Sequence, residues 1–403
     1  MAEFQEERLT GFNMVYGVAV DLIYAKALKN VTILRAGRGP YFLQSAAQFK
    51  NDASGKVEEK YEAFREIVGA ESCKDFQIWD SGGFSIWTST LYPADLSPES
   101  IGTYYRRYPC ALGIGADAPI YNSGFEMMLK VGMPLTKRFH RAFKKPRGML
   151  HYEPIHGLFA DDDGNFTLAQ KKRWVEEVRN VVGDSADGWA MRLPYELGSV
   201  VNAYFAMFPL SYGMENFHVL GTARLELLCL FVYLAQAYKR LSVDATNFTI
   251  QAVENPMVHR FVNGRPKSFP LKGKTDVEVI ARELANCQGF NGEPCEICAF
   301  MSCKLGKTFG EAFRGFRMVR YARVTDKKKV ITKQFNEWLL THNIAVVERF
   351  VDELKALVHD RAAFFQFLER IKMGSVVAAI TGIVDPVLAS DREAYAQHLS
   401  LLG

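Results

Sequence analysis

The sequence predicts an α/β protein, a parallel (β/α)8 barrel of the TIM type. Between about residues 30 and 250, a short apolar run is followed by a longer helical stretch, and this pattern repeats. Each apolar run ends in polar or glycine-rich residues. The candidate strands are residues 31–35, 76–79, 111–116, 148–154, 188–193, 217–220 and 241–243. Seven such units make closure into a barrel the economical arrangement, with an eighth strand after Thr249. A doubly wound open sheet is the alternative.

Composition is that of an ordinary folded protein. The chain has 403 residues, 48% of them hydrophobic and 13% aromatic, which is enough to bury one large core. Its first eight residues are acidic overall and lack the basic region and apolar run of a signal peptide. The most apolar stretch, residues 225–237, is shorter than the ~20 residues of a membrane span. These features predict a soluble, cytoplasmic protein that does not bind a membrane.

The strand predicted at residues 76–79 leads into the string Trp79-Asp80-Ser81-Gly82-Gly83-Phe84. Asp80 therefore falls at the carboxyl end of a strand, where barrels of this type place their chemistry. The two glycines lack Cβ atoms, so a planar ligand can approach the main chain closely, and Phe84 offers a stacking face. A tight turn without chemistry is the alternative, because Ser-Gly-Gly is also a common turn sequence.

Two more aspartates end predicted strands in the same way. Asp117 follows the run 111–116, and Asp244 follows the run 241–243 after a long apolar helix. The carboxyl ends of parallel strands meet at one mouth, so these carboxylates and Asp80 are expected to share a pocket. A helix cap or a loop salt bridge remains the alternative for each.

Four of the seven cysteines crowd into the segment from Cys287 to Cys303. In a reducing compartment this crowding favours a metal site over disulfides. Cys295 and Cys298 form a Cys-x-x-Cys knuckle, and with Cys287 and His342 they would supply three thiolates and one imidazole. That ligand set closes the tetrahedral shell of a structural Zn²⁺. Cys303 competes with Cys287 for the third thiolate, and a redox-active Cys-x-x-Cys pair is the other alternative.

No repeat, low-complexity tract or long flexible linker interrupts the chain, so residues 1–403 are expected to form a single domain. Within it we expect a barrel at about 30–255, a zinc-binding subdomain at about 256–345 and C-terminal packing helices at about 346–403.

The positive charge is unevenly distributed. The whole chain carries a net charge of +4, but between Lys304 and Lys333 ten Lys or Arg residues stand against Glu311 and Asp326, a local balance of +8. Many of these cations recur every three residues, which gives a slanting stripe suited to successive phosphates of a nucleic acid. The predicted contacts are Arg314, Arg317, Arg320, Arg323, Lys327 and Lys328. A solvated helix face is the alternative, although such a face would mix in more acidic residues.

The Asp-Ser-Gly-Gly-Phe string resembles the signature of the tRNA-guanine transglycosylase family, enzymes that exchange a guanine in a nucleic acid for a 7-deazaguanine. The resemblance spans roughly residues 76–343. It implies that Asp117 binds the N1 and amino edge of the base through a charge-assisted pair of hydrogen bonds. Other positions that match the family's base pocket are Ser81, Gly82, Gly83, Phe84, His156, Gly157, Leu220 and Gly221. The family usually has glutamine where His156 stands.

The resemblance also implies the roles of the two remaining aspartates. Exchange with retained configuration needs two displacements, in which one carboxylate attacks the anomeric carbon and a second group shuttles a proton. Asp244 stands at the position of the nucleophile, and Asp80 is the second group. None of the residues that usually flank the family's nucleophile is kept, so this assignment rests on position. Thr341-His342-Asn343 resembles the string that holds the family's zinc histidine, whereas the usual Cys-x-Cys spacing is expanded by residues 288–294.

We therefore expect a DNA-guanine transglycosylase that inserts a 7-deazaguanine, such as 7-cyano-7-deazaguanine, into DNA. Ser85 and the departures from the family pattern look more like the phage and bacterial DNA enzymes than the tRNA enzymes. A phage protein of this kind would work in the host cytoplasm. The partners expected are DNA, the free base and, as one option for the oligomeric state, a second copy in a homodimer. A tRNA-guanine transglycosylase of the queuosine or archaeosine pathway is the runner-up, and a non-catalytic nucleic-acid-binding subunit is a further alternative.

Overall fold

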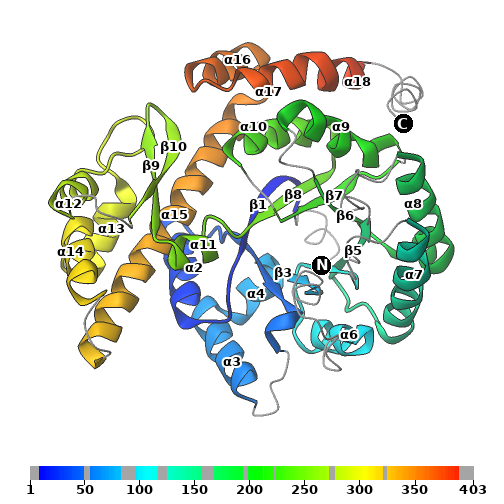
Figure 1. Cartoon of the computed structure of the whole chain (residues 1–403), viewed down its shortest axis with the longest axis horizontal. Helices are drawn as coiled ribbons and strands as arrows, with labels where there is room; N and C mark the ends of the chain where they lie inside the picture. Colours follow the sequence, from blue (N-terminus) through cyan, green and yellow to red (C-terminus); the bar gives the residue numbers. More distant parts are fainter. Residues whose placement is uncertain are drawn as a thin grey trace.

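A closed barrel of eight parallel strands forms the centre of the molecule (Figure 1). The structure, a computed structural model, describes residues 9–49, 55–82, 97–116, 125–155, 168–193, 198–211, 213–221, 224–271, 277–320 and 325–389. Each strand pairs with the next, and β1 pairs with β8 to close the ring. The strands are β1 (Gly11–Gly17), β2 (Tyr41–Ser45), β3 (Gln77–Asp80), β4 (Leu112–Ile114), β5 (Leu150–Ile155), β6 (Gly188–Arg192), β7 (Asn216–Leu220) and β8 (Arg240–Ala245). The predicted (β/α)8 fold is confirmed.

The predictions for the first and the last strand of the barrel are wrong. Residues 31–35, expected as a strand, belong mostly to a helix that ends at Leu34, and they are apolar because that helix buries Leu28 and Val31 on one face. The true first two strands, β1 and β2, were missed, so the barrel begins at Gly11 and not near residue 30. The eighth strand expected after Thr249 does not exist in the ring, because β8 already closes it.

Helices surround the barrel. Those on its wall are α2 (Leu22–Leu34), α3 (Lys56–Val68), α4 (Ala70–Phe76), α6 (Pro98–Arg107), α7 (Phe125–Ala142), α8 (Leu168–Val182), α9 (Gly198–Ser211), α10 (Leu225–Leu234) and α11 (Ile250–Glu254). The long helix α15 (Asp326–Leu357) packs against both α2 and α10, so it takes the remaining place in the ring (Figure 1). Arg35 at the end of α2 fixes this contact through ion pairs with Glu348 and Asp352 of α15.

A smaller unit precedes α15 in the chain and lies at one side of the barrel (Figure 1). It contains the antiparallel pair β9 (Met257–Val262) and β10 (Arg265–Pro270), and helices α12 (Val277–Ala285), α13 (Glu296–Leu305) and α14 (Phe309–Arg320). The first half of α15 closes over its apolar core, so one helix serves both units. The boundary expected near residue 345 therefore falls inside α15.

After α15, short helices lie across the outside of α9 and α10. They are α16 (Arg361–Arg370), α17 (Gly374–Ala379), a π-helical turn (Ile380–Val384) and α18 (Asp385–Ala389). No helix in the described part of the chain is long and apolar enough to cross a membrane.

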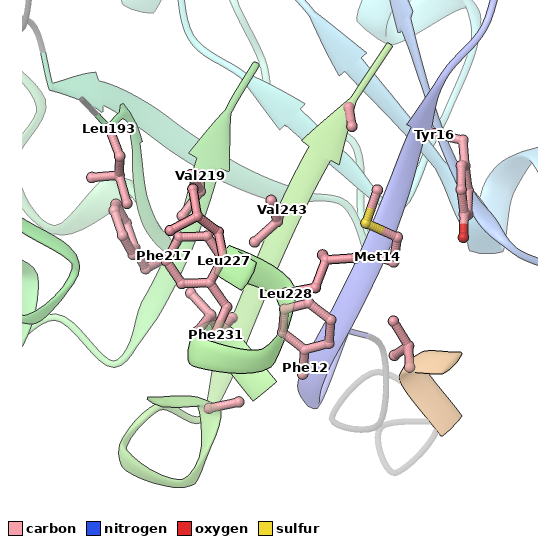
Figure 2. Close-up of a cluster of buried hydrophobic side chains, with 14 of the residues drawn as sticks. Phe12, Met14, Tyr16, Leu193, Phe217, Val219, Leu227, Leu228, Phe231 and Val243 are labelled. Carbon is pink, nitrogen blue, oxygen red and sulfur yellow. The ribbon is translucent and has the colours of Figure 1, made fainter. Parts of the chain in front are cut away.

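Side chains alternate between two layers along each strand. The outer layer lies between strands and helices: Figure 2 shows Phe217 and Val219 of β7 and Val243 of β8 beside Leu227 and Phe231 of α10. The inner layer fills the barrel with a separate apolar cluster, to which β3, β6 and β7 contribute Ile78, Ala190 and Leu220. Because side chains have a period of two along a strand, neighbours of outer-layer residues face the barrel interior.

Candidate functional site

The strand alternation places both predicted catalytic aspartates inside the barrel mouth. On β8, Val243 belongs to the outer layer, so Asp244 faces inward. On β3, Trp79 belongs to the outer layer, so Asp80 also faces inward. Both stand near the carboxyl ends of their strands, which confirms the expected location of the two carboxylates at one end of the barrel.

Asp244 is held in place by groups from the neighbouring strand β7. Its Oδ1 atom accepts a hydrogen bond from the backbone N–H of Gly221 at 2.8 Å and lies 3.2 Å from Nε2 of His218. His218 is itself oriented by Oγ of Ser242, 2.8 Å from its Nδ1. Only 4% of Asp244 is exposed. Among the described residues Oδ2 has no hydrogen-bond partner, so one carboxylate oxygen is anchored and the other is available.

Asp80 is fixed by a similar contact to the backbone. Its Oδ2 atom accepts a hydrogen bond from the N–H of Gly82 at 3.1 Å. Gly82 has φ +85°, and a Cβ atom there would lie 2.6 Å from the Cβ of Ala47 and 2.8 Å from Oγ of Ser45. Glycine is therefore required at this position on two grounds, the left-handed backbone and the lack of space.

A tyrosine behind the mouth ties the ends of two strands together. The hydroxyl of Tyr105 lies 3.3 Å from the carbonyl of Trp79 and 2.7 Å from that of Ile114. Burial and then the charge of Asp80 raise the pKa of Tyr105 well above its usual value, so the hydroxyl keeps its proton. The carbonyls that it reaches precede Asp80 and the loop that leads to Asp117.

Some residues predicted for the base pocket lie at the ends of β3 and β7, and others lie outside the described part of the chain. Ser81 is buried directly after β3. Leu220 belongs to the inner apolar cluster, beside the strand that carries Asp244, and Gly221 follows it with φ +85°. The structure does not describe the predicted residues Gly83, Phe84, Asp117, His156, Gly157 and Arg323.

Two residues of the mouth had no role assigned from the sequence. His218 lies within the strand predicted at residues 217–220, and a residue two positions before a strand end faces the same way as the end itself. Arg192 ends β6 after the outer-layer residue Met191, so it faces the barrel interior. Arg192 could have been found in the sequence in the same way as Asp80, as a charged residue near the end of an apolar run.

The predicted zinc ligands converge. The candidate ligand atoms of Cys287, Cys295, Cys298 and His342 all lie within 4.8 Å of one another. Nε2 of His342 is 3.3 Å from Sγ of Cys287 and 3.6 Å from Sγ of Cys295. Bond lengths of about 2.3 Å to sulfur and 2.0 Å to nitrogen give ligand separations of roughly 3.5 Å around a tetrahedral ion, so the spacing fits Zn²⁺.

A hairpin explains the expanded cysteine spacing. Residues 288–294 fold back on themselves, with a bridge between Gln288 and Pro294 and a hydrogen bond from Cys295 N to Cys287 O at 3.1 Å. The fold-back brings Cys287 beside the knuckle at the start of α13. Cys303 is exposed and is not part of the cluster, which decides the competition in favour of Cys287.

The Thr341-His342-Asn343 string locks this centre to its surroundings. Asn343 accepts a hydrogen bond from His259 N at 2.8 Å and donates one to Met257 O at 2.9 Å, which attaches β9 to α15. Burial lowers the pKa of His342, but the thiolates of Cys287 and Cys295 outweigh it and raise that pKa to about 10. A divalent metal bound by these four residues would supply positive charge to the cluster.

The predicted basic stripe lies on α14 and the start of α15, in the side unit and not in the barrel wall (Figure 1). Arg314 forms an exposed ion pair with Glu278 at 2.9 Å, so its charge is partly compensated. Lys327 is exposed, and Lys328 is partly exposed in the first turn of α15. Arg317 is partly buried, and Arg320 ends α14, where its side chain is not described.

Comparison with known proteins adds little to this description. No protein-family model matches the sequence, and no curated protein matches it. Among solved structures, N-acetylneuraminate lyase from Mycoplasma synoviae is 10% identical with a TM-score of 0.37, over 82% of this chain and 97% of that one. A fructuronate-tagaturonate epimerase from Cohnella laeviribosi is 9% identical with a TM-score of 0.39, over 93% and 82%. These low scores carry no inference about activity, and the barrel assignment comes from the closed strand order.

Proposed function

We propose that the protein is a DNA-guanine transglycosylase, which exchanges a guanine in DNA for a 7-deazaguanine through a covalent aspartyl intermediate. The observation that carries this proposal is the state of Asp244, a buried carboxylate with one anchored oxygen and one available oxygen at the barrel mouth. A nucleophile for a sugar carbon needs this combination, because the anchored oxygen fixes the direction of attack.

Two displacements account for the exchange. In the first, Oδ2 of Asp244 bonds to the anomeric carbon, the bond from that carbon to N9 of guanine breaks, and the departing base takes a proton from Asp80. In the second, Asp80 removes a proton from the incoming base, whose nitrogen bonds to the anomeric carbon while the ester to Asp244 breaks. Asp80 ends as it began, and the configuration is retained. The hydrogen bonds from Gly221 and His218 stabilise the carboxylate when it leaves the sugar.

Contact with the polymer is assigned to the basic stripe and to the charge of Arg192. The lysines Lys327, Lys328 and Lys329 occupy the first turn of α15, where the helix dipole disfavours cations by about 0.3–1 kcal/mol each. Lys329 forms an exposed ion pair with Asp326, and the charge of Lys327 and Lys328 in this turn supports a role in binding an external anion such as a phosphate. The metal centre, with Zn²⁺ bound, joins the unit that carries the stripe to the barrel helix α15.

The choice of DNA over tRNA rests on the resemblance described above. The target base must leave its stack to reach a carboxylate buried in the mouth, so an unpaired or flipped guanine is required in either polymer. DNA needs no 2′-hydroxyl contact, and none of the features described here depends on one.

The deciding experiment incubates the protein with labelled guanine and either duplex DNA or tRNA, and measures which polymer takes up label. Uptake into DNA is expected. Asp244→Asn should abolish uptake and any covalent protein-nucleic acid adduct, because an amide cannot attack the anomeric carbon. Asp360→Asn, which keeps a capping side chain at the start of α16, is the matched control and should behave as wild type.

Exchange confined to tRNA would replace the DNA assignment with its runner-up. Binding of nucleic acid without exchange, in a protein that retains both aspartates, would favour a non-catalytic subunit. An adduct that persists in Asp244→Asn would move the nucleophile elsewhere, with Asp80 as the next candidate.

A further inference from the structure

A second group of metal-type ligands lies in the barrel wall, outside the mouth. It consists of His140 on α7 and of His151 and Glu153 on β5, whose candidate ligand atoms all lie within 4.8 Å of one another. Nε2 of His140 is 2.5 Å from Oε1 of Glu153, and Nε2 of His151 contacts the same oxygen. Both imidazoles therefore reach one oxygen of the same carboxylate.

The positions of these residues on β5 and α7 explain why they lie together. His151 and Glu153 are two residues apart on β5 and share its outer face, because Tyr152 between them belongs to the inner cluster. α7 precedes β5 and packs near it, so His140 in its last turn reaches the same place. The ring of Phe139 stacks on His151 at a centroid distance of 5.5 Å, which gives the cluster an apolar wall.

The carboxylate of Glu153 fits here because the residue that faces it, just after the neighbouring strand β4, is a glycine. Gly115 follows β4, and a Cβ atom there would lie 2.8 Å from Oε2 and 3.0 Å from Oε1 of Glu153. A side chain at position 115 would therefore collide with both carboxylate oxygens of Glu153. The backbone N–H of Gly115 donates a hydrogen bond to Tyr152 O at 2.8 Å, which holds Gly115 beside β5.

Among the described residues, the ion pairs of Glu153 are with histidines and not with a lysine or an arginine. The residue is 1% exposed, and in the described ranges its ion pairs are with His140 and His151 and with no Lys or Arg. Removing a carboxylate from water costs several kcal/mol unless a positive charge compensates it. A divalent cation bound by these three residues would supply that positive charge.

We propose that His140, His151 and Glu153 bind a divalent transition-metal ion, distinct from the ion of the cysteine centre. Two nitrogen donors and one carboxylate are ligands that zinc, iron(II), manganese and cobalt accept. His151 and Glu153 are each 1% exposed, so no substrate reaches the ion, and its role is structural. It clamps α7 to β5 beside the end of β4, the strand that leads to Asp117.

The competing arrangement is a metal-free triad in which both imidazoles donate hydrogen bonds to Glu153. Nδ1 of His151 has no hydrogen-bond partner among the residues that the structure describes, so the surroundings do not fix the tautomer of this ring. Its Nε2 can therefore serve as a donor or as a metal ligand, and metal binding has to be measured directly.

Cobalt titration of the full-length apoprotein separates the two centres. Co²⁺ bound to thiolates gives an intense sulfur-to-metal charge-transfer absorption in the near ultraviolet, whereas Co²⁺ bound by nitrogen and oxygen gives only weak visible bands. We expect cobalt binding to continue after the charge-transfer signal saturates. Glu153→Gln should abolish that additional binding and keep the thiolate signal. His140→Gln, at a partly exposed residue that is less important for folding, should do the same.

His359→Gln, at an exposed histidine on a different part of the surface, is the matched control and should leave both phases unchanged. The proposal is overturned if wild-type protein binds no cobalt beyond the thiolate signal, which would establish the metal-free triad. It is also overturned if the additional cobalt persists in both Glu153→Gln and His140→Gln.

Discussion

Nε2 of His218 lies 3.2 Å from Oδ1 of Asp244, and both side chains face the interior of the barrel from adjacent strands. Oγ of Ser242 holds the other ring nitrogen at 2.8 Å, so a line of three polar groups runs along the inner face of β7 and β8. The histidine contacts Oδ1, the oxygen that Gly221 also anchors. We therefore expect His218 to position the nucleophile.

His218→Phe should lower kcat for base exchange by about 10- to 100-fold with little change in KM, because it removes a hydrogen bond to a charged group worth ~1.5–3 kcal/mol. His218→Gln places an amide N–H near the same point and should recover part of the loss. Steady-state exchange of labelled guanine measures both. Equal losses in the two variants, with lowered thermal stability, would indicate a purely structural histidine.

Removing one ligand should empty the cysteine centre. Cys298→Ala is expected to lose about one equivalent of zinc per chain and to lower the melting temperature, because a metal held by Cys298 and His342 would join α13 to α15. Elemental analysis and thermal unfolding provide the measurement. Cys303→Ser is the control at an exposed cysteine outside the cluster and should retain the metal. Wild-type protein without any zinc would show that the centre is misassigned.

The basic stripe should contribute affinity without sequence preference. Arg317→Ala and Lys327→Ala should each weaken DNA binding on all sequences and reduce the slope of log K against log salt by about 0.9, the effect of one phosphate contact. Lys29→Ala, at an exposed lysine on barrel helix α2, should leave the slope unchanged. Fluorescence anisotropy at several salt concentrations tests this. Equal slopes in all variants would show that the stripe is a solvated helix face that does not contact DNA.

A buried lysine predicts a pH dependence of stability. Burial lowers the pKa of Lys171 on α8 to about 7, whereas an unfolded chain has a lysine pKa of about 10.4. Between these values the unfolded chain binds more protons, so the free energy of unfolding rises with pH, by at most about 1.4 kcal/mol per pH unit from this group. Lys171→Met should therefore be more stable than wild type at pH 7, with a difference that shrinks towards pH 10.

Denaturant unfolding at a series of pH values gives that difference directly. Lys172→Met, which changes the adjacent exposed lysine, is the control and should show a constant small difference. A difference for Lys171→Met that does not change with pH would mean that the amine is uncharged or compensated over the whole range.

The sequence by itself determined the barrel and the ends of most of its strands. Buried parallel strands are short apolar runs, and the residue that closes each run lies at the mouth, so Asp80 and Asp244 could be located from local pattern alone. The Cys-x-x-Cys knuckle was equally local, because its two cysteines share the start of one helix, α13.

Only the tertiary structure decided the secondary structure of segments whose local pattern is ambiguous. It also decided which residues distant in the chain contact one another. Residues 31–35 are as apolar as a strand, because α2 buries one face between the barrel and α15. The choice of Cys287 over Cys303 depends on a hairpin, and the anchoring of Asp244 by His218 and Gly221 depends on the register of β7 with β8. The contacts of Asp244 join residues 23 and 26 positions apart, and local residue preferences contain no information about which distant partner is selected.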